Sequence, residues 1–150
     1  MVEFSAGILL YRRSPGLEVF LGKMGGPFWA RKDAAAWSIP KGLYTDEEPL
    51  AAALREFAEE IGAPAPDAEY ALLGEFRQPS GKRLTVFAAE ADARFVASNT
   101  FEVEWPPRSG RMQQFPEIET AQWFDLDTAG EKLVKGQLPI LERILSAVSG

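Results

Sequence analysis

Length, composition and charge exclude several classes of protein. The chain has 150 residues, enough for one domain with one core, and 46% of them are hydrophobic while 25% are charged. Cysteine and histidine are absent, which rules out disulfides, zinc held by thiolates or imidazoles, and a histidine general base. The net charge of −6 argues against a large nucleic-acid-binding surface.

The sequence also predicts where the protein works. No hydrophobic run approaches the roughly 20 residues that a transmembrane helix needs, so we expect no membrane contact. Residues 1–7 lack the basic and apolar regions of a signal peptide, so we expect a cytoplasmic protein. Because cysteine and histidine are absent, metal ligands are limited to oxygen, which favours hard ions such as Mg²⁺ or Mn²⁺.

Strand patterns dominate the first forty residues. Residues 4–11 and 17–21 are apolar and rich in β-forming residues, and the turn Ser14-Pro15-Gly16 between them predicts a hairpin. A long loop follows over residues 25–36, and loops of this length are often functional. A short strand over residues 37–39 then leads into Pro40-Lys41-Gly42.

The next stretch predicts a helix over residues 48–61. Thr45 or Asp46 is positioned to cap it, and Pro49 suits the first turn, where no hydrogen bond of an N–H group is lost. Gly62 suits the left-handed conformation that ends many helices. The positions expected to face the core are Leu50, Leu54, Phe57 and Ile61.

The rest of the chain alternates strands with two further helices. The predicted elements are strands over 70–77 and 84–90 joined by a turn at 79–81, a strand over 101–105, a loop over 106–115 with Arg108 and Arg111, a strand over 121–124, a helix from the N-cap Asp125 to about Val134, and a helix from Pro139 to about Val148. This mixture predicts an α+β fold, with helices on the faces of one sheet, in a single domain over residues 1–150.

Three carboxylates share one face of the first predicted helix. Glu56, Glu59 and Glu60 are spaced i, i+3 and i+4, so their side chains lie side by side. They fall outside the apolar stripe and should face away from the core. Because like charges repel, this arrangement suggests that the three carboxylates hold a divalent cation.

The stretch from Gly42 to Ala63 resembles the Nudix box, the signature of the Nudix hydrolase family. The pattern is G-x5-E-x7-R-E-U-x-E-E-x-G-U, where U is apolar, and residues 55–63 match its second half. Counting back seven places from Arg55 gives Glu47 as the first glutamate and leaves the preceding loop one residue short. Glu48 would restore that loop and shorten the next spacer. We prefer Glu47, because a loop absorbs a deletion more easily than a helix start does.

The resemblance implies a fold and a reaction. The fold would be the Nudix fold, a mixed β-sheet sandwiched between α-helices. The reaction would be Mg²⁺- or Mn²⁺-dependent hydrolysis of a pyrophosphate link in a nucleoside diphosphate joined to another group. The partner would be a small nucleotide, and a homodimer would be in keeping with the family.

The resemblance also implies roles for the box residues. The metal ligands would be Glu56, Glu59, Glu60 and the backbone carbonyl of Lys41. Arg55 would pair with Glu59, or reach Glu47 and hold the loop against the helix. Gly42 would let the backbone turn beside the metal, and Gly62 ends the motif.

The general base is open at this stage. It is a box glutamate, Glu56 or Glu59, or a carboxylate from a distal loop, for which Glu117 and Glu119 are the candidates. Glu90, at the end of a predicted strand, is a candidate for an additional ligand. Taken one at a time, Glu90, Glu117 and Glu119 could each be an ordinary charged surface residue.

Substrate-binding residues are proposed from charge and aromatic character. Lys41 is placed to meet a phosphate, and Arg108 and Arg111 could grip further phosphates. The other candidates are Arg31 and Lys32 for phosphate, and Phe28, Trp29, Trp37 and Tyr44 for stacking on a base.

Several substrates stay open. The P-K-G segment and the tryptophan before it resemble the dinucleoside polyphosphate hydrolases of the family, and nucleoside triphosphates, ADP-ribose and nucleotide sugars are alternatives. An isoprenoid diphosphate isomerase ranks low, because its chemistry relies on cysteine and histidine. A non-catalytic nucleotide-sensing module also ranks low, because it would be expected to lose box carboxylates.

Overall fold

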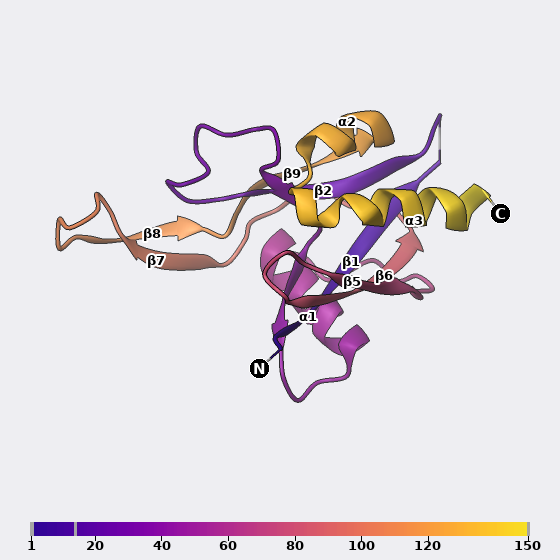
Figure 1. Ribbon diagram of the computed structural model, residues 1–150, viewed down its shortest axis with the longest axis horizontal. Coiled ribbons are helices and arrows are strands. Elements are labelled where there is room, and N and C mark those ends of the chain that lie inside the picture. The colour runs from indigo at the N-terminus through magenta and orange to yellow at the C-terminus, as the bar shows by residue number, and fades with distance from the viewer. Residues whose placement is uncertain (1, 14, 150) are drawn as a thin grey trace.

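The computed structural model describes residues 2–13 and 15–149. Figure 1 shows the order and arrangement of its elements. These are β1 (Phe4–Arg12), β2 (Glu18–Met24), β3 (Trp37–Ser38), β4 (Lys41–Tyr44), α1 (Pro49–Ile61), β5 (Ala71–Arg77), β6 (Arg83–Glu90), β7 (Thr100–Glu104), β8 (Met112–Pro116), β9 (Ile118–Asp125), α2 (Leu126–Lys132), a short 3₁₀ helix η1 (Lys135–Gln137) and α3 (Leu138–Ser149). Within the described residues, no helix is both long and apolar enough to cross a membrane.

The main sheet is mixed and has seven strands. β1 runs parallel to β6, and its other neighbours, β2 and β4, are antiparallel to it. β1 pairs with β2 only near the hairpin end, at Tyr11↔Val19 and Arg12↔Glu18, which confirms the predicted hairpin. Ser14 of the predicted turn lies outside the described residues. The first half of β1 pairs with β4 instead, while β2 continues beside β3 and β9, so the two strands separate toward one end of the sheet.

Both faces of the sheet are buried, which confirms the predicted sandwich of a mixed sheet between helices. Ile8 and Leu10 of β1 pack on one face with Phe57 and other residues of α1. Leu9 points to the opposite face and joins the core that α2 and α3 cover. Burying a large apolar side chain contributes about 1.5–3 kcal/mol, so the alternation along β1 ties both helical layers to one strand.

Helix α1 begins and ends for identifiable reasons. Glu48 is extended, as a residue before proline tends to be, so the helix begins at Pro49. Neither Thr45 nor Asp46 caps it, and that prediction was wrong: Glu48 is the N-cap residue and makes no side-chain cap. Gly62 has φ +89° and ends the helix as predicted.

The buried face of α1 differs in part from the prediction. The fully buried residues are Ala52, Ala53, Phe57 and Ile61. Leu50 and Leu54, which were expected in the core, are only half-buried at its edge. Phe57 and Ile61 are buried as predicted, and in the first turns the small alanines take the core positions because they let the helix approach the sheet closely.

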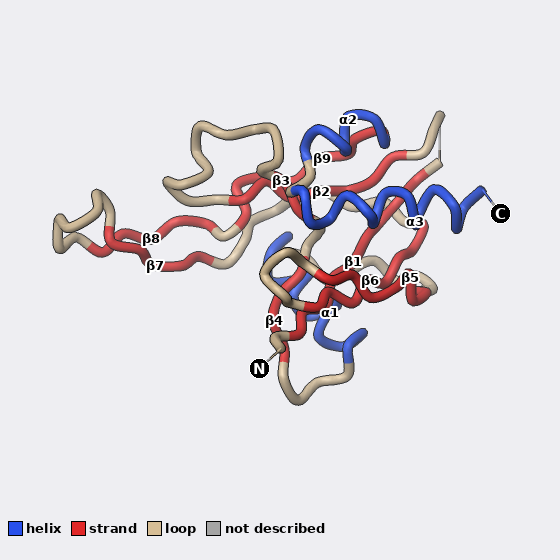
Figure 2. The backbone as a smooth tube through the Cα atoms, viewed as in Figure 1, coloured by secondary structure: helices blue, strands red, loops and turns tan. Residues whose placement is uncertain are grey.

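Residues 106–115 were predicted as a loop, which is confirmed for residues 106–111 and wrong for residues 112–115. Met112–Pro116 form β8, which pairs with β7 in a separate two-stranded sheet. This hairpin projects from the main sheet at the left of Figure 2. Phe28 of the long loop packs edge-on against Trp105 at its tip, with ring centroids 5.5 Å apart. The polar residues of β8 hide its strand character in the sequence.

The C-terminal elements follow the predictions closely. β9 spans residues 118–125, longer than the expected 121–124. Asp125 caps α2 as predicted, because its carboxylate accepts a 2.7 Å hydrogen bond from the Thr128 N–H group. α3 begins at Leu138, one residue before the proline that marked its expected start.

Candidate active site

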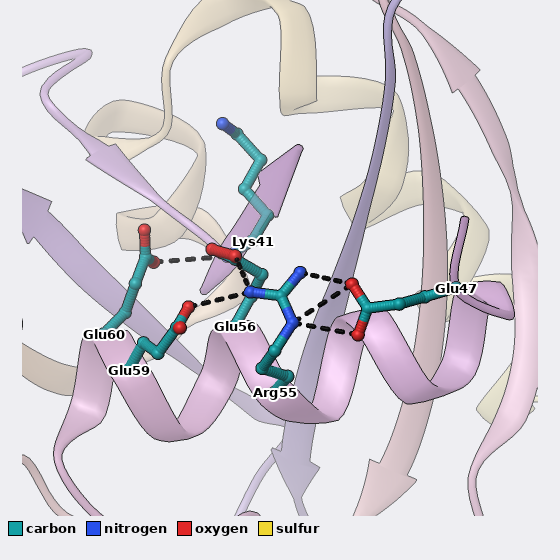
Figure 3. A network of polar contacts seen from close by, with 6 residues as sticks. All are labelled: Lys41, Glu47, Arg55, Glu56, Glu59 and Glu60. Carbon is teal, nitrogen blue, oxygen red and sulfur yellow. Dashed lines mark hydrogen bonds and ion pairs between the residues drawn. The ribbon is translucent and has the colours of Figure 1, made fainter. Parts of the chain in front are cut away.

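Arg55 is the centre of a polar network on α1 (Figure 3). Its Nε and Nη2 atoms donate to both carboxylate oxygens of Glu47, at 2.6–3.1 Å. Its Nη1 atom donates to Glu56 at 2.6 Å and to Glu59 at 3.0 Å. One guanidinium therefore fixes the orientation of three carboxylates, and its planar fork suits the bidentate contact with Glu47.

The contact between Arg55 and Glu47 ties the loop before α1 to the helix. Hydrogen bonds from Arg55 lower the pKa of the Glu47 carboxyl, so that side chain stays ionised. Glu48, the alternative first glutamate, is exposed at the N-cap position and makes no recorded contact with Arg55. The structure thus brings Glu47, and not Glu48, to the arginine.

Gly42 and Glu56 are in close contact. An added β-carbon at Gly42 would lie 1.8 Å from Oε1 of Glu56, so only glycine fits here without movement of the carboxylate. The Glu56 side chain is only 14% exposed. Burial raises the pKa of its carboxyl, and the hydrogen bond from Arg55 opposes that rise. Glu56 lies outside the buried stripe of α1, as expected, but its carboxylate packs against Gly42 of β4 instead of being open to solvent.

Glu60 is held by the backbone of β4. The N–H group of Lys41 donates to Oε1 of Glu60 at 3.2 Å. Burial raises the pKa of the Glu60 carboxyl to about 8. Glu60 therefore lies against β4 and is half-buried, which shields its carboxylate in part from water.

Lys41 presents both its backbone and its side chain to this region. The N–H group of Ile8 bonds to the Pro40 carbonyl at 3.0 Å, which makes Gly7↔Lys41 a non-hydrogen-bonded pair between β1 and β4. The Lys41 carbonyl then points to the same side as its N–H group, toward Glu60. The Lys41 side chain extends away from α1 (Figure 3).

Glu60 and Glu117 line one cavity of about 220 Å³. The other residues that line it are Met24, Gly25, Trp29, Ser38, Lys41, Phe101 and Ile118. The Glu117 backbone is fixed on both sides, since its carbonyl accepts from Gly25 and its N–H group donates to Asn99, both at 2.8 Å. Burial raises the pKa of the Glu117 carboxyl, and the negative charge of Glu59 raises it further.

The carboxylates of this site are the kind of oxygen ligand that a hard divalent cation prefers. No group of three acidic side chains already converges on one point among the described residues, because Arg55 holds Glu56 and Glu59 while Glu60 bonds to Lys41. Yet Glu60 and Glu117 line the same cavity, and neither forms an ion pair within the described chain. A divalent cation would relieve the cost of keeping these carboxylates ionised. The identity of the ligands stays a prediction.

A larger cavity of about 560 Å³ lies beside the first. Met24, Trp29, Ser38 and Lys41 line both. Residues of the larger cavity that the sequence did not single out are Ser5, Met24, Ser38, Gln78, Lys82, Leu84, Val134, Lys135, Gly136 and Gln137. The turn at Pro79–Gly81 was predicted only as a connection, and no sequence signal marks Gln137, which is fully buried.

Two other carboxylates considered as site residues lie elsewhere. Glu119 forms an ion pair with Lys23 at 3.1 Å and does not line either cavity. Glu90 pairs with Arg13 at 2.7 Å, beyond the end of β1 that meets β2. Glu117 is therefore the distal carboxylate that the fold brings to Glu60.

The predicted role of Arg108 and Arg111 in gripping phosphate is not supported by their position. Both lie in the exposed connection between β7 and β8, and neither lines the two cavities. The carboxylate of Glu104 accepts hydrogen bonds from the backbone N–H groups of Arg108 and Gly110, which closes this turn as a hairpin tip. The hairpin carries these arginines outward because residues 112–116 form a strand instead of continuing the loop.

Of the four aromatic candidates, only Trp29 lines the two cavities. Trp37 is in the core, where its indole N–H group donates to Asp33 at 3.0 Å. Phe28 packs on the hairpin, and Tyr44 packs beside the core under α1. Arg31 and Lys32 are exposed, and the Lys32 ammonium lies 5.3 Å from the centre of the Trp29 ring.

Comparison with known proteins agrees with this architecture. The model of the NUDIX domain matches residues 1–144. No curated protein matches the chain. Solved structures show the fold: a Caenorhabditis elegans Ap4A hydrolase in a binary complex has a TM-score of 0.68 at 20% identity, with 99% of both chains covered.

Two further structures share the fold, and their ligand or activity differs from that of the nematode protein. The NUDIX domain of Shewanella oneidensis NrtR, complexed with ADP-ribose, has a TM-score of 0.66 at 18% identity, with 99% of this chain and 89% of that chain covered. An ADP-ribose pyrophosphatase from Streptococcus suis has a TM-score of 0.66 at 14% identity, with 100% and 94% covered. The match to the family model supports the expected class of enzyme, a hydrolase acting on phosphoric anhydride bonds. With this match over nearly its whole length, the chain belongs to the NUDIX-domain family.

Proposed function

We propose that this protein is a metal-dependent pyrophosphohydrolase that cleaves a pyrophosphate link in a nucleoside diphosphate joined to another group. The observation that carries the proposal is the pair of carboxylates, Glu60 and Glu117, in one cavity beside the Arg55 network. Bound Mg²⁺ or Mn²⁺ would neutralise phosphate oxygens and activate a water molecule. Glu56, Glu59, Glu60 and the Lys41 carbonyl would hold the ion.

The residues of the chain divide the remaining work. The Lys41 side chain lies where the two cavities meet and would bind a phosphate oxygen. Glu117 is our candidate for the general base: its raised pKa favours proton uptake, and it makes no recorded ion pair in the described chain. Arg55 would act on the box carboxylates by keeping Glu47, Glu56 and Glu59 in position. Glu56 or Glu59 is the alternative base.

The larger cavity supports a substrate with a sizeable second part. Its volume of about 560 Å³ falls within the usual range of small-molecule sites, about 300–1,000 Å³. Trp29 offers a partly exposed indole ring on which a base could stack. A dinucleoside polyphosphate is our first choice, since the similar nematode protein is an Ap4A hydrolase, and ADP-ribose, nucleotide sugars and nucleoside triphosphates are the alternatives.

The competing function is nucleotide sensing without catalysis. The NrtR domain with bound ADP-ribose shows that this fold can hold a nucleotide in a protein whose name is not that of a hydrolase. Glu56, Glu59 and Glu60 are all present here, which favours catalysis over sensing.

We also propose that the protein is cytoplasmic and forms a homodimer. Gel filtration with light scattering tests whether it is a dimer.

A substrate panel tests the proposal. Phosphate or pyrophosphate release is measured from dinucleoside polyphosphates, ADP-ribose, nucleotide sugars and triphosphates, with Mg²⁺, with Mn²⁺ and with EDTA. We expect cleavage of at least one substrate that stops in EDTA, and a loss of orders of magnitude in Glu59→Gln and Glu60→Gln. Glu142→Gln, an exposed change on α3, is the matched control and should keep full activity. Full activity in EDTA, or in both site variants, would rule out the metal site, and no cleavage of any substrate would favour the sensing module.

A further inference from the structure

We infer that the larger cavity binds a part of the substrate that carries phosphate groups of its own, beyond the pyrophosphate link that is cleaved. This inference rests on the proposed function, because it places the cleaved link in the neighbouring smaller cavity. The evidence is the charge of the cavity wall, the separate segments that supply that charge, and the residues that line both cavities.

The wall of the larger cavity is positively charged in an acidic protein. Lys41, Lys82 and Lys135 line it, and among residues 2–13 and 15–149 no aspartate or glutamate does. The whole chain carries a net charge of −6. Three cations around one concave surface repel each other, and this arrangement concentrates anions there.

The three lysines come from separate segments. Lys41 begins β4, Lys82 lies just before β6 and Lys135 begins η1. The fold therefore gathers charges that are far apart in the sequence, whereas a solvated run of lysines would be contiguous.

These cations have little internal compensation. The closest recorded carboxylate is that of Glu3, 3.9 Å from the Lys82 ammonium, and its side chain is 57% exposed. An exposed pair at this distance contributes little. Lys41 and Lys135 make no recorded ion pair within residues 2–13 and 15–149. The nearest acidic groups facing Lys41 are Glu60 and Glu117, which belong to the smaller cavity.

The floor of the larger cavity is polar but already satisfied. The Gln137 side chain accepts from the Ile39 N–H group at 3.0 Å and donates to the Ser38 hydroxyl at 2.9 Å. The Ser38 hydroxyl donates in turn to the Ile39 carbonyl at 2.7 Å. This buried network gives a rigid floor, and it leaves the lysines as the charged groups free to recognise a ligand.

The path between the cavities sets the order of groups in the substrate. Because Lys41 and Trp29 line both cavities, a ligand with its cleaved link beside Glu60 and Glu117 enters the larger cavity past Lys41. Phosphates beyond that point would meet Lys82 and Lys135. They could belong to a longer chain between two nucleosides, or to a phosphate ester on the sugar.

Paired probes distinguish these two sources. Diadenosine tetraphosphate against diadenosine diphosphate isolates the phosphates of the chain, and 2′-phospho-ADP-ribose against ADP-ribose isolates a phosphate on the sugar. We compare kcat/KM with Mg²⁺ for the wild type, for Lys82→Gln/Lys135→Gln, and for Arg13→Gln/Arg94→Gln. The last variant removes the same charge at exposed arginines that do not line the cavities.

The inference predicts that the wild type prefers at least one of the phosphate-rich probes over its partner. The lysine double variant should lose about tenfold or more of that preference, mainly through KM, while the arginine variant keeps it. The pair of probes that shows this loss identifies the source: the diadenosine pair indicates phosphates of the chain, and the ADP-ribose pair indicates a phosphate on the sugar. An unchanged preference in the lysine variant, or no preference in the wild type, would overturn the inference.

If no probe is cleaved, the proposed function is rejected but the inference is not. A binding measurement then tests the inference by itself. Inorganic tripolyphosphate is titrated calorimetrically into each protein in EDTA at low salt. The wild type and the arginine variant should bind it at least about tenfold more tightly than the lysine variant does. Equal affinity in all three proteins would overturn the inference.

Discussion

Gly42 and Glu56 meet so closely that a β-carbon on Gly42 would lie 1.8 Å from the glutamate oxygen. Gly42→Ala must therefore displace either β4 or the Glu56 carboxylate, and both carry proposed metal ligands. We expect a loss of activity of about 100-fold, as a shift of about 1 Å in reacting groups can cause. Steady-state kinetics on the best substrate of the panel measure it. Gly16→Ala is the control, since an added β-carbon there meets none of the residues that the structure describes within 4 Å.

The Arg55 contact predicts different outcomes for two neighbouring glutamates. Glu47→Gln weakens the bidentate bond that holds the loop to α1, and we expect activity to fall about 10- to 100-fold, as is common for residues that orient metal ligands. Glu48→Gln changes an exposed N-cap side chain with no recorded cap hydrogen bond and should keep its activity. Equal losses in the two variants would mean that the first box glutamate is wrongly assigned.

Glu60 makes the stability of the metal-free protein depend on pH. Its carboxyl has a folded-state pKa of about 8, above the ordinary value of 4.5. The unfolded chain therefore releases this proton first as pH rises, and stability should fall between about pH 4.5 and pH 8. Urea unfolding in EDTA across this window measures the fall. Glu60→Gln should flatten the curve, and an equally steep curve in that variant would contradict the assignment.

Lys23 links the long loop to the sheet. Its ammonium donates to the Trp29 carbonyl at 2.9 Å and pairs with Glu119, while the residue is buried. Lys23→Met removes one of the two donors to that carbonyl, which also accepts from the Lys32 N–H group at 3.0 Å, and it breaks the ion pair with Glu119. Because the lost hydrogen bond is charged, we expect a loss of about 1–3 kcal/mol in the free energy of unfolding. Lys32→Met changes an exposed lysine of the same loop and should cost much less. Urea denaturation compares them, and similar losses would mean that the Lys23 contacts do not stabilise the loop.

The position of Arg108 and Arg111 predicts that they are dispensable. The double change to alanine alters the exposed hairpin tip, away from both cavities. We expect kcat/KM for the best substrate to stay within about twofold of the wild type, since surface changes of this kind have small effects. A tenfold loss would show that the hairpin reaches the substrate, contrary to the structure.

The sequence predicts those parts of the site that depend on local spacing. Helix α1 follows from Pro49, the apolar periodicity and Gly62, and the proximity of Glu56, Glu59 and Glu60 follows from helical geometry. Arg55 and Glu47 lie eight residues apart, on the helix and the loop before it, so the resemblance to a known motif was enough to connect them.

The parts that were missed depend on contacts between distant segments. The burial of Glu60 arises where β4 covers α1, and the larger cavity joins β1, β2, the turn at 79–81 and η1. No periodicity within one segment reports such an arrangement. Arg108 and Arg111 were misplaced for the same reason, because the pairing of β7 with β8 decides where that turn points.

The dependence of hydrolysis on metal and on Glu60 tests the central claim most directly. Cleavage of the best substrate is followed in protein stripped with EDTA and then titrated with Mg²⁺, for the wild type, Glu60→Gln and Glu142→Gln. The account predicts no cleavage before Mg²⁺ is added, saturable recovery in the wild type and in Glu142→Gln, and little or no recovery in Glu60→Gln. Undiminished cleavage by Glu60→Gln, or by stripped protein, would contradict it.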